Sequence, residues 1–387
     1  MFKKIAFFVG SGISYCSNVP SVEQLTKEIL ESAWFLHTDQ WFYPAPEKDA
    51  PNDELMQEKR EYAHKVQKFI WLIYEHIYKN VLSKEGRPPN YEDICGCLNQ
   101  ILQDETVEIV NPLIACDIDI LKAKSADLWL SLRPQIDNNR FATLASQAAD
   151  LIECAVCYLL SNKKPKGLDL FVKAKEIFDE VDIFTLNHDT LIEQQFDNAK
   201  ILYVDGFGKN GGDVKWFDSI WDQNSSSVRL FKLHGSVNWL RINNKYAKIL
   251  KGSYDSLKDS EGKRIGIPAS ERNILTGIII KEQHYGHEPF IELFAQFHNR
   301  LKEHKLLFIS GYGWGDHGIN VRIAYWLAAS KNNKIVIFHK NGEADISGKK
   351  FWGNWRWTEF HDKSDQVTVI PKWLCECSLD DIQKYFK

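Results

Sequence analysis

Residues suited to chemistry follow four apolar runs of this sequence. Asn187 and Asp189 come after one run, His234 after another, and glycine-rich turns at 10–14 and 310–313 follow the other two. A neutral imidazole can act as a general base, a carboxylate can stabilise a developing positive charge, and a carboxamide can orient an amide or a water molecule. The carboxyl ends of parallel strands meet at one edge of a sheet, so this order indicates a nucleotide site built there.

Each of these residues also has a simpler interpretation. Asn187 or Asp189 would serve as the cap of the helix that follows, because both residue types are good N-caps. His234 would be a buried structural histidine. The Gly10-Ser11-Gly12 turn lets a backbone approach a pyrophosphate. Its third fingerprint position is not glycine, however, which disfavours a Rossmann dehydrogenase, and such a turn more often serves packing alone.

Apolar periodicity predicts an alternation of strands and helices, interrupted by a long helical segment. The expected strands are 5–9, 181–186, 228–233, 274–280, 306–309 and 334–338. The expected helices are 21–36, 53–82, 91–103, 110–132, 141–160, 190–196, 289–303 and 319–330, and the segment 243–272 is expected to be polar and looped. Strands that alternate with helices favour a parallel, doubly wound sheet.

The predicted fold class is therefore α/β, a Rossmann-like parallel sheet with a large helical insertion after the first strand and helix. We expect residues 1–40 and 165–387 to form the nucleotide-binding domain and residues 41–164 to form the inserted helical domain. A chain of 387 residues with 44% hydrophobic content can fill cores of this size.

Composition argues against several classes of partner and site. The net charge of −4 gives no global reason to bind nucleic acid or a membrane surface. The apolar run after Lys3-Lys4 is too short for a secretion signal, and no uninterrupted apolar segment has membrane-spanning length. We expect a soluble, cytoplasmic protein whose 8 cysteines are reduced. The cysteine pairs lack a compact zinc-site spacing, so no metal is expected.

Taken together, the motifs resemble those of the sirtuin (silent information regulator) superfamily. Gly10-Ser11-Gly12-Ile13-Ser14 matches its Gly-Ala-Gly-Ile-Ser turn, and Asn18-Val19-Pro20 stands where sirtuins have Gly-Ile-Pro. Thr185, Asn187 and Asp189 keep the Thr-Gln-Asn-Ile-Asp motif, and His234-Gly235 matches the catalytic His-Gly. The stretch from Gly311 to Asn320 resembles the Gly-Tyr-Ser-Phe-Gly-Asp…Ile-Asn signature of bacterial sirtuin-like defence proteins.

The resemblance implies an NAD site and assigns a role to each matching residue. Asn187, His234 and Asp189 are implied to be catalytic. The residues implied to bind NAD are Gly10, Ser11, Gly12, Ser14, Ser310, Gly311, Tyr312, Asp316 and Asn320.

Two departures from the sirtuin pattern change the expected reaction. Sirtuin deacylases carry four zinc-binding cysteines between the His-Gly motif and the late glycine loop, whereas this chain has no cysteine between Cys157 and Cys375. Ser21-Val22 also replaces the usual Phe-Arg after the proline. The resemblance therefore favours hydrolysis of NAD to nicotinamide and ADP-ribose over removal of an acyl group from a peptide.

The resemblance further implies anti-phage defence by NAD depletion, a homo-oligomer, and a HerA-type hexameric ATPase as a separate partner. The alternatives are a non-catalytic module that senses NAD or ADP-ribose, and a protein deacylase or ADP-ribosyl transferase. The aromatic stretch 351–357 is a candidate partner or self-association surface, or else a packed edge strand.

Overall fold

The structure is a computed structural model. It describes residues 3–36, 42–44, 54–80, 87–106, 114–132, 138–161, 163–210, 213–216, 220–223, 227–242, 245–248, 272–274, 286–343, 350–352, 355–356 and 365–386. Two compact units emerge: an α/β unit of residues 1–19, 162–252 and 282–387, and a helical unit of residues 20–161 and 253–281. The domain boundaries predicted from the sequence, after residues 40 and 164, differ from the boundaries of these two units and stay a prediction.

Six parallel strands form the central sheet of the α/β unit, in the order β15-β12-β11-β1-β4-β7. Chain order reverses at β1, with β4 and β7 on one side and β11, β12 and β15 on the other, and such a switch point is where open α/β sheets bind ligands. The strands are β1 (Lys4–Val9), β4 (Glu180–Thr185), β7 (Val228–Lys232), β11 (Leu306–Ser310), β12 (Lys334–Phe338) and β15 (Val367–Ile370).

The register of these strands aligns their carboxyl ends. Val9 lies opposite both Ser310 and Thr185, and Thr185 lies opposite Lys232. The four sequence motifs that follow these strands therefore begin at one edge of the sheet.

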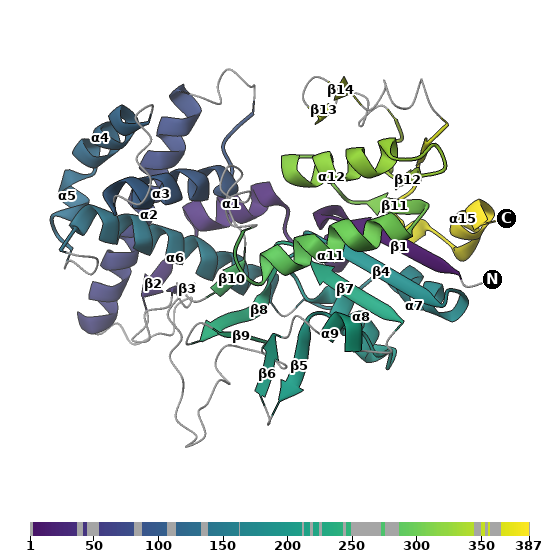
Figure 1. Ribbon diagram of the computed structural model, residues 1–387. Coiled ribbons are helices and arrows are strands. Elements are labelled where there is room, and N and C mark those ends of the chain that lie inside the picture. Colours follow the sequence, from purple (N-terminus) through teal and green to yellow (C-terminus); the bar gives the residue numbers. More distant parts are fainter. Residues whose placement is uncertain are drawn as a thin grey trace. The chain divides into compact units, whose positions relative to one another are not determined.

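Helices cover both faces of the sheet, as a doubly wound fold requires. Phe7 packs edge-on against Phe171 of one layer, with 5.2 Å between ring centroids, and Phe8 packs against Phe297 of the other at 5.7 Å. The helices that flank the sheet are α7 (Asp169–Ile177), α8 (Leu191–Asn198), α11 (Phe290–Glu303) and α12 (His317–Ala328) (Figure 1). The predicted α/β, Rossmann-like fold is confirmed.

Smaller elements complete the α/β unit. β9 lies inside the segment predicted to be looped, so that prediction was wrong there; Leu240 and Ala247 pair across β8 and β9. Within the aromatic stretch, β13 and β14 pair antiparallel. These elements are η1 (Ser11–Ser17), β5 (Phe207–Asn210), β6 (Asp213–Trp216), α9 (Ile220–Gln223), β8 (Gly235–Ile242), β9 (Lys245–Lys248), β13 (Lys350–Trp352), β14 (Trp355–Arg356), η5 (Leu374–Glu376), α15 (Leu379–Gln383) and η6 (Lys384–Phe386).

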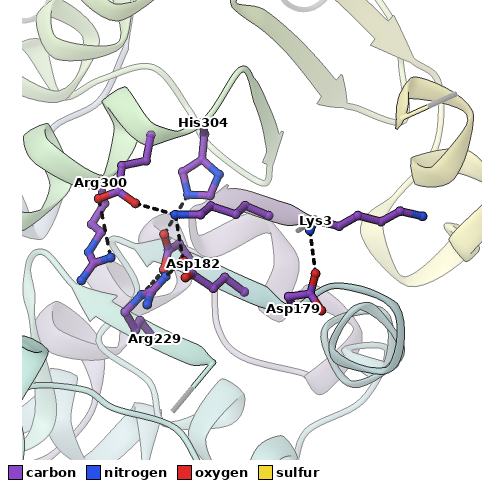
Figure 2. A network of polar contacts seen from close by, with 9 residues as sticks. Lys3, Asp179, Asp182, Arg229, Arg300 and His304 are labelled. Carbon is purple, nitrogen blue, oxygen red and sulfur yellow. Dashed lines mark hydrogen bonds and ion pairs between the residues drawn. The ribbon is translucent and has the colours of Figure 1, made fainter. Parts of the chain in front are cut away.

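A buried ionic network joins strands at the amino end of the sheet (Figure 2). Asp182 accepts hydrogen bonds from Arg229 Nε at 2.5 Å and from His304 Nε2 at 2.7 Å. Arg229 also pairs with Glu180, which lies 3.3 Å from Lys4 Nζ. Burial alone would raise the pKa of Asp182, but the hydrogen bond from His304 and the charge of Arg229 outweigh it and lower that pKa.

The helical unit is built around α6, whose buried residues lie on all sides of the helix. This helix is long and apolar enough to cross a membrane by composition, but 67% of that window is buried, as in the core helix of a soluble protein. The elements of the unit are α1 (Val22–Glu31), β2 (Trp34–Leu36), β3 (Phe42–Pro44), α2 (Glu54–Asn80), α3 (Tyr91–Glu105), α4 (Ala115–Lys124), α5 (Ala126–Trp129), α6 (Arg140–Leu160) and β10 (Arg272–Ile274).

Two predicted helices of this unit were too long. The first ends at Glu31, because Ser32 turns to an extended backbone and Trp34–Leu36 pairs with β3. The helix predicted over 110–132 is divided at Ser125 into α4 and α5. The hydroxyl of Ser125 donates a hydrogen bond to Leu121 O and so competes with the backbone hydrogen bonds of the helix. The predicted strand 274–280 lies outside the described residues beyond Ile274.

Candidate NAD site

The two glycine turns pack directly against each other at the carboxyl edge. Gly10 N donates to Ser310 O and Gly12 N to Gly311 O, both at 3.0 Å. A Cβ atom on Gly10 would lie 2.6 Å from Gly311 O, so only glycine fits this approach. Gly311 itself has a φ of +65°, which also favours glycine. These glycines join β1 to β11, and the amides of Gly10 and Gly12 are already used in doing so.

Ser14, buried in η1, links two of the predicted site residues. Its hydroxyl donates to Asp189 Oδ2 at 2.7 Å and accepts from Asn187 Nδ2 at 3.0 Å. η1 follows the glycine turn directly, so the turn delivers Ser14 to the end of β4. The structure thus brings together Ser14, Asn187 and Asp189 as the sequence motifs predicted.

The carboxamide of Asn187 is held through its nitrogen only. Its Oδ1 atom is buried and has no hydrogen-bond partner among the described residues, while the residue as a whole is 6% exposed. A buried acceptor without a partner costs about 1–3 kcal/mol of stability. That cost is expected where a side chain is reserved for a ligand.

Asp189 is a fully buried carboxylate. Its Oδ1 accepts from Leu191 N, the first residue of α8, at 3.1 Å, although Thr190 is the N-cap residue of that helix; Oδ1 of Asn187 accepts no such bond among the described residues. Burial raises the pKa of Asp189, against the lowering effects of the Lys232 charge and the hydrogen bond from Ser14. The Asp189 carboxyl group is therefore harder to ionise in the folded protein than in the unfolded chain, although it lies beside a cation.

His234 is oriented by Asp316. Nε2 of the imidazole and Oδ2 of Asp316 lie 2.9 Å apart, and both side chains are buried. The other carboxylate oxygen of Asp316 caps α12 by accepting from Ile319 N at 3.0 Å. A base held by a carboxylate that is itself fixed to a helix is the arrangement found where a histidine moves protons.

The loop between β11 and α12 is fixed by its own polar side chains. Tyr312 donates to Asn320 Oδ1 at 2.7 Å, and Asn320 Nδ2 donates to Trp314 O at 2.9 Å. Trp314 adopts a φ of +61°, a strained conformation for a bulky residue that functional sites often hold. Ser310 donates to Phe338 O at 3.4 Å. In this structure Ser310, Tyr312 and Asn320 thus bond to the protein's own groups.

Two features of the site were not predicted from the sequence. Lys232, 1% exposed, donates to the backbone oxygen of Asp189 and lies 3.1 Å from Glu193. Asp316 was expected to bind NAD and is found holding His234. A lysine between the apolar residues Phe231 and Leu233 was the available signal for Lys232, because a buried charge needs a partner. Nothing in the spacing could have paired Asp316 with His234, which lie 82 positions apart.

Among the described residues, no group of three or more His, Cys, Asp or Glu side chains could hold a metal ion. The expectation that the protein uses no metal stays a prediction.

Comparisons with known proteins support an NAD-related function. No curated protein matches the chain. Residues 181–358 match the family model of the SIR2-like domain. That range contains Asn187, His234 and Asp316, and SIR2-like domains are typically NAD-using enzymes. The fold, the site at the carboxyl edge and this match agree: the chain carries a SIR2-like domain over residues 181–358, which supports a sirtuin-like family.

Proposed function

We propose that this protein is an NAD glycohydrolase, which cleaves the nicotinamide–ribose bond to give nicotinamide and ADP-ribose. The observation that carries the proposal is the pairing, at one sheet edge, of a buried carboxamide oxygen without a partner on Asn187 with a histidine oriented by Asp316. The first suits an amide or water ligand, and the second suits removal of a proton.

The reaction needs charge stabilisation and a base more than it needs an acid. Nicotinamide leaves as a neutral molecule and takes the electrons of the C1′–N bond, so positive charge builds on the ribose, as in other glycosyl transfers. When ionised, Asp189 supplies a negative charge that is linked to Asn187 through the shared Ser14 hydroxyl. Water then bonds to C1′ and loses a proton.

His234 would accept that proton. If Nε2 carries the hydrogen bonded to Asp316, the lone pair of the neutral ring lies on Nδ1. The carboxylate of Asp316 would stabilise the imidazolium that forms. NAD and water are consumed, and nicotinamide, ADP-ribose and one proton are produced.

Hydrolysis is favoured over deacylation by the sequence between the motifs. The chain has no cysteine from position 158 to position 374, and this interval includes the stretch between the His-Gly motif and the late glycine loop, in which sirtuin deacylases carry four zinc ligands. Without that module, water is the simplest acceptor for the ribose.

We propose further that the activity depletes NAD during anti-phage defence, in a homo-oligomer that works with a HerA-type hexameric ATPase. The similarity of residues 311–320 to bacterial sirtuin-like defence proteins supports this role. Co-purification of the chain with such an ATPase, followed by sizing of the complex, tests the partner.

The activity is tested by incubating the purified chain with NAD and resolving the products by chromatography. Nicotinamide and ADP-ribose should appear with the wild type and vanish with His234→Ala and with Asn187→Ala. Bound but intact NAD would favour the sensing module instead. A bystander acetylated peptide in the same reaction, followed by mass spectrometry, would reveal deacylation or ADP-ribosyl transfer.

A further inference from the structure

Two cysteines from opposite ends of the chain meet beside the candidate site. Cys16 lies in η1 and Cys375 in η5, and their Sγ atoms are 2.6 Å apart. That separation is shorter than a contact between two non-bonded sulfur atoms and longer than a disulfide bond, which measures about 2.05 Å. Both residues are free thiols of intermediate exposure, so small oxidants in solvent can reach them.

Contacts made by the neighbours of Cys16 hold the two sulfur atoms close to each other. On one side of Cys16, the Tyr15 ring stacks on Trp373 with 5.9 Å between centroids and a 17° tilt. On the other side, Ser17 accepts a hydrogen bond from Lys166 N at 2.9 Å. η1 and η5 are therefore packed together independently of any bond between the thiols.

Gly167 makes room for the pair. It has a φ of +77°, and a Cβ atom there would lie 2.4 Å from Cys375 Cβ and 3.3 Å from Cys16 Cβ. Any larger residue would push the two cysteines out of position. A glycine at position 167 is therefore required for the two cysteines to lie side by side.

We propose that Cys16 and Cys375 are a redox-modification site, which forms a reversible disulfide on exposure to a peroxide and so ties η1 to the C-terminal segment. The inference does not depend on the proposed reaction with NAD. Cys16 lies two residues after Ser14, so the bond would fix the helix that carries the hydroxyl shared by Asn187 and Asp189.

The oxidation proceeds in two balanced steps. The sulfur of one cysteine attacks hydrogen peroxide, the O–O bond breaks, and a sulfenic acid and one water result. The second thiol then attacks that sulfur, the S–O bond breaks, and a second water leaves as the disulfide forms. Both sulfur atoms are oxidised, the peroxide is reduced, and a dithiol reductant reverses the change.

Cys16 is the cysteine expected to react first. Burial, followed by the hydrogen bond with Cys16, raises the pKa of Cys375 to about 11, so Cys375 is a thiol near neutral pH. Cys377 is not part of the pair, because its sulfur donates to Trp373 O at 3.2 Å.

The test treats the full-length, freshly reduced protein with one equivalent of hydrogen peroxide. Non-reducing digestion and mass spectrometry should find the Cys16 and Cys375 peptides linked, with the loss of two hydrogen atoms, and a reductant should restore them. The matched control Cys377→Ser should still form the link, and Cys16→Ser and Cys375→Ser should not. Amide hydrogen exchange in residues 11–17 should slow by roughly tenfold in the oxidised form.

Two results would overturn the proposal. One is oxidation of Cys16 to the sulfinic acid with no linked peptide, while the exposed Cys116 is modified at a similar rate. The other is the same slowing of exchange in Cys16→Ser, since that variant cannot form the bond.

Discussion

At the amino end of the central sheet, Asp182, Arg229 and His304 satisfy one another, whereas at the carboxyl end Asn187 keeps a buried oxygen without a partner. The two regions lie at opposite ends of β4, which contains Asp182 and ends two residues before Asn187. The amino-end network is arranged to be stable as it stands. The carboxyl end retains an unfavourable group that a ligand would satisfy, which is how functional sites differ from structural ones.

Two buried aspartates of β4 and its following turn show the same contrast in their ionisation. The pKa of Asp182 is lowered, because the hydrogen bond from His304 and the charge of Arg229 outweigh its burial. The pKa of Asp189 is raised, because burial outweighs the charge of Lys232. Ionised Asp182 therefore stabilises the fold, and ionised Asp189 destabilises it.

Removing the cation of the amino-end network should have the largest effect on stability. Arg229→Met leaves Asp182 and Glu180 without their shared partner, and breaking a buried pair in this way costs about 3–5 kcal/mol. Urea denaturation measures the loss. The control Lys27→Met removes an exposed partner 3.9 Å from Glu31 and should cost less than about 0.5 kcal/mol. Equal losses for the two variants would contradict the structural role of the network.

Asp316→Asn should separate catalysis from stability at the carboxyl end. Asparagine is also a good N-cap, so α12 should keep its cap and the free energy of unfolding should change by less than about 1 kcal/mol. The amide cannot stabilise a protonated His234, and NAD cleavage should fall by roughly 10²-fold or more. Asp316→Ala, which also removes the cap, should lose the same activity and about 1 kcal/mol more stability. Full activity in Asp316→Asn would exclude its role in orienting the base.

The pH dependence of stability should carry opposite signs for the two aspartates. With its pKa lowered, Asp182 contributes stability that is present above its ordinary value of about 3.8 and lost as pH falls through the folded-state pKa. Asp182→Asn should therefore be less stable than the wild type at neutral pH, by about 1–3 kcal/mol, and the gap should close in acid.

For Asp189 the folded protein binds more protons than the unfolded chain between about 3.8 and the raised pKa, so stability falls as pH rises through that window. Asp189→Asn should be as stable as the wild type or more stable at neutral pH. Unfolding free energies measured by denaturant from pH 3 to 7 check both variants. A parallel pH profile for the two differences would contradict the comparison.

Five of the six strands of the central sheet, and the site edge, could be predicted because these strands are largely apolar runs that end in a glycine or polar turn, as in 5–9 before Gly10, whereas β15 was not among the predicted strands. The pairing of Asp316 with His234 could not, because it depends on how the loop after β11 folds back. Helix ends were also missed where aromatic residues continue the apolar pattern, as Trp34 does beyond Glu31. Apolar periodicity reports burial and is silent about the change from helix to strand.

The most direct test of the account is the melting temperature and the NAD cleavage rate of Asn187→Ala, measured on one preparation beside the wild type. The account predicts a melting temperature within about 2 °C of the wild type, because the buried oxygen without a partner disappears as the bond to Ser14 is lost. It also predicts a loss of NAD cleavage of roughly 10²-fold or more. A variant that melts far below the wild type and still cleaves NAD would show that Asn187 serves the fold and not the ligand.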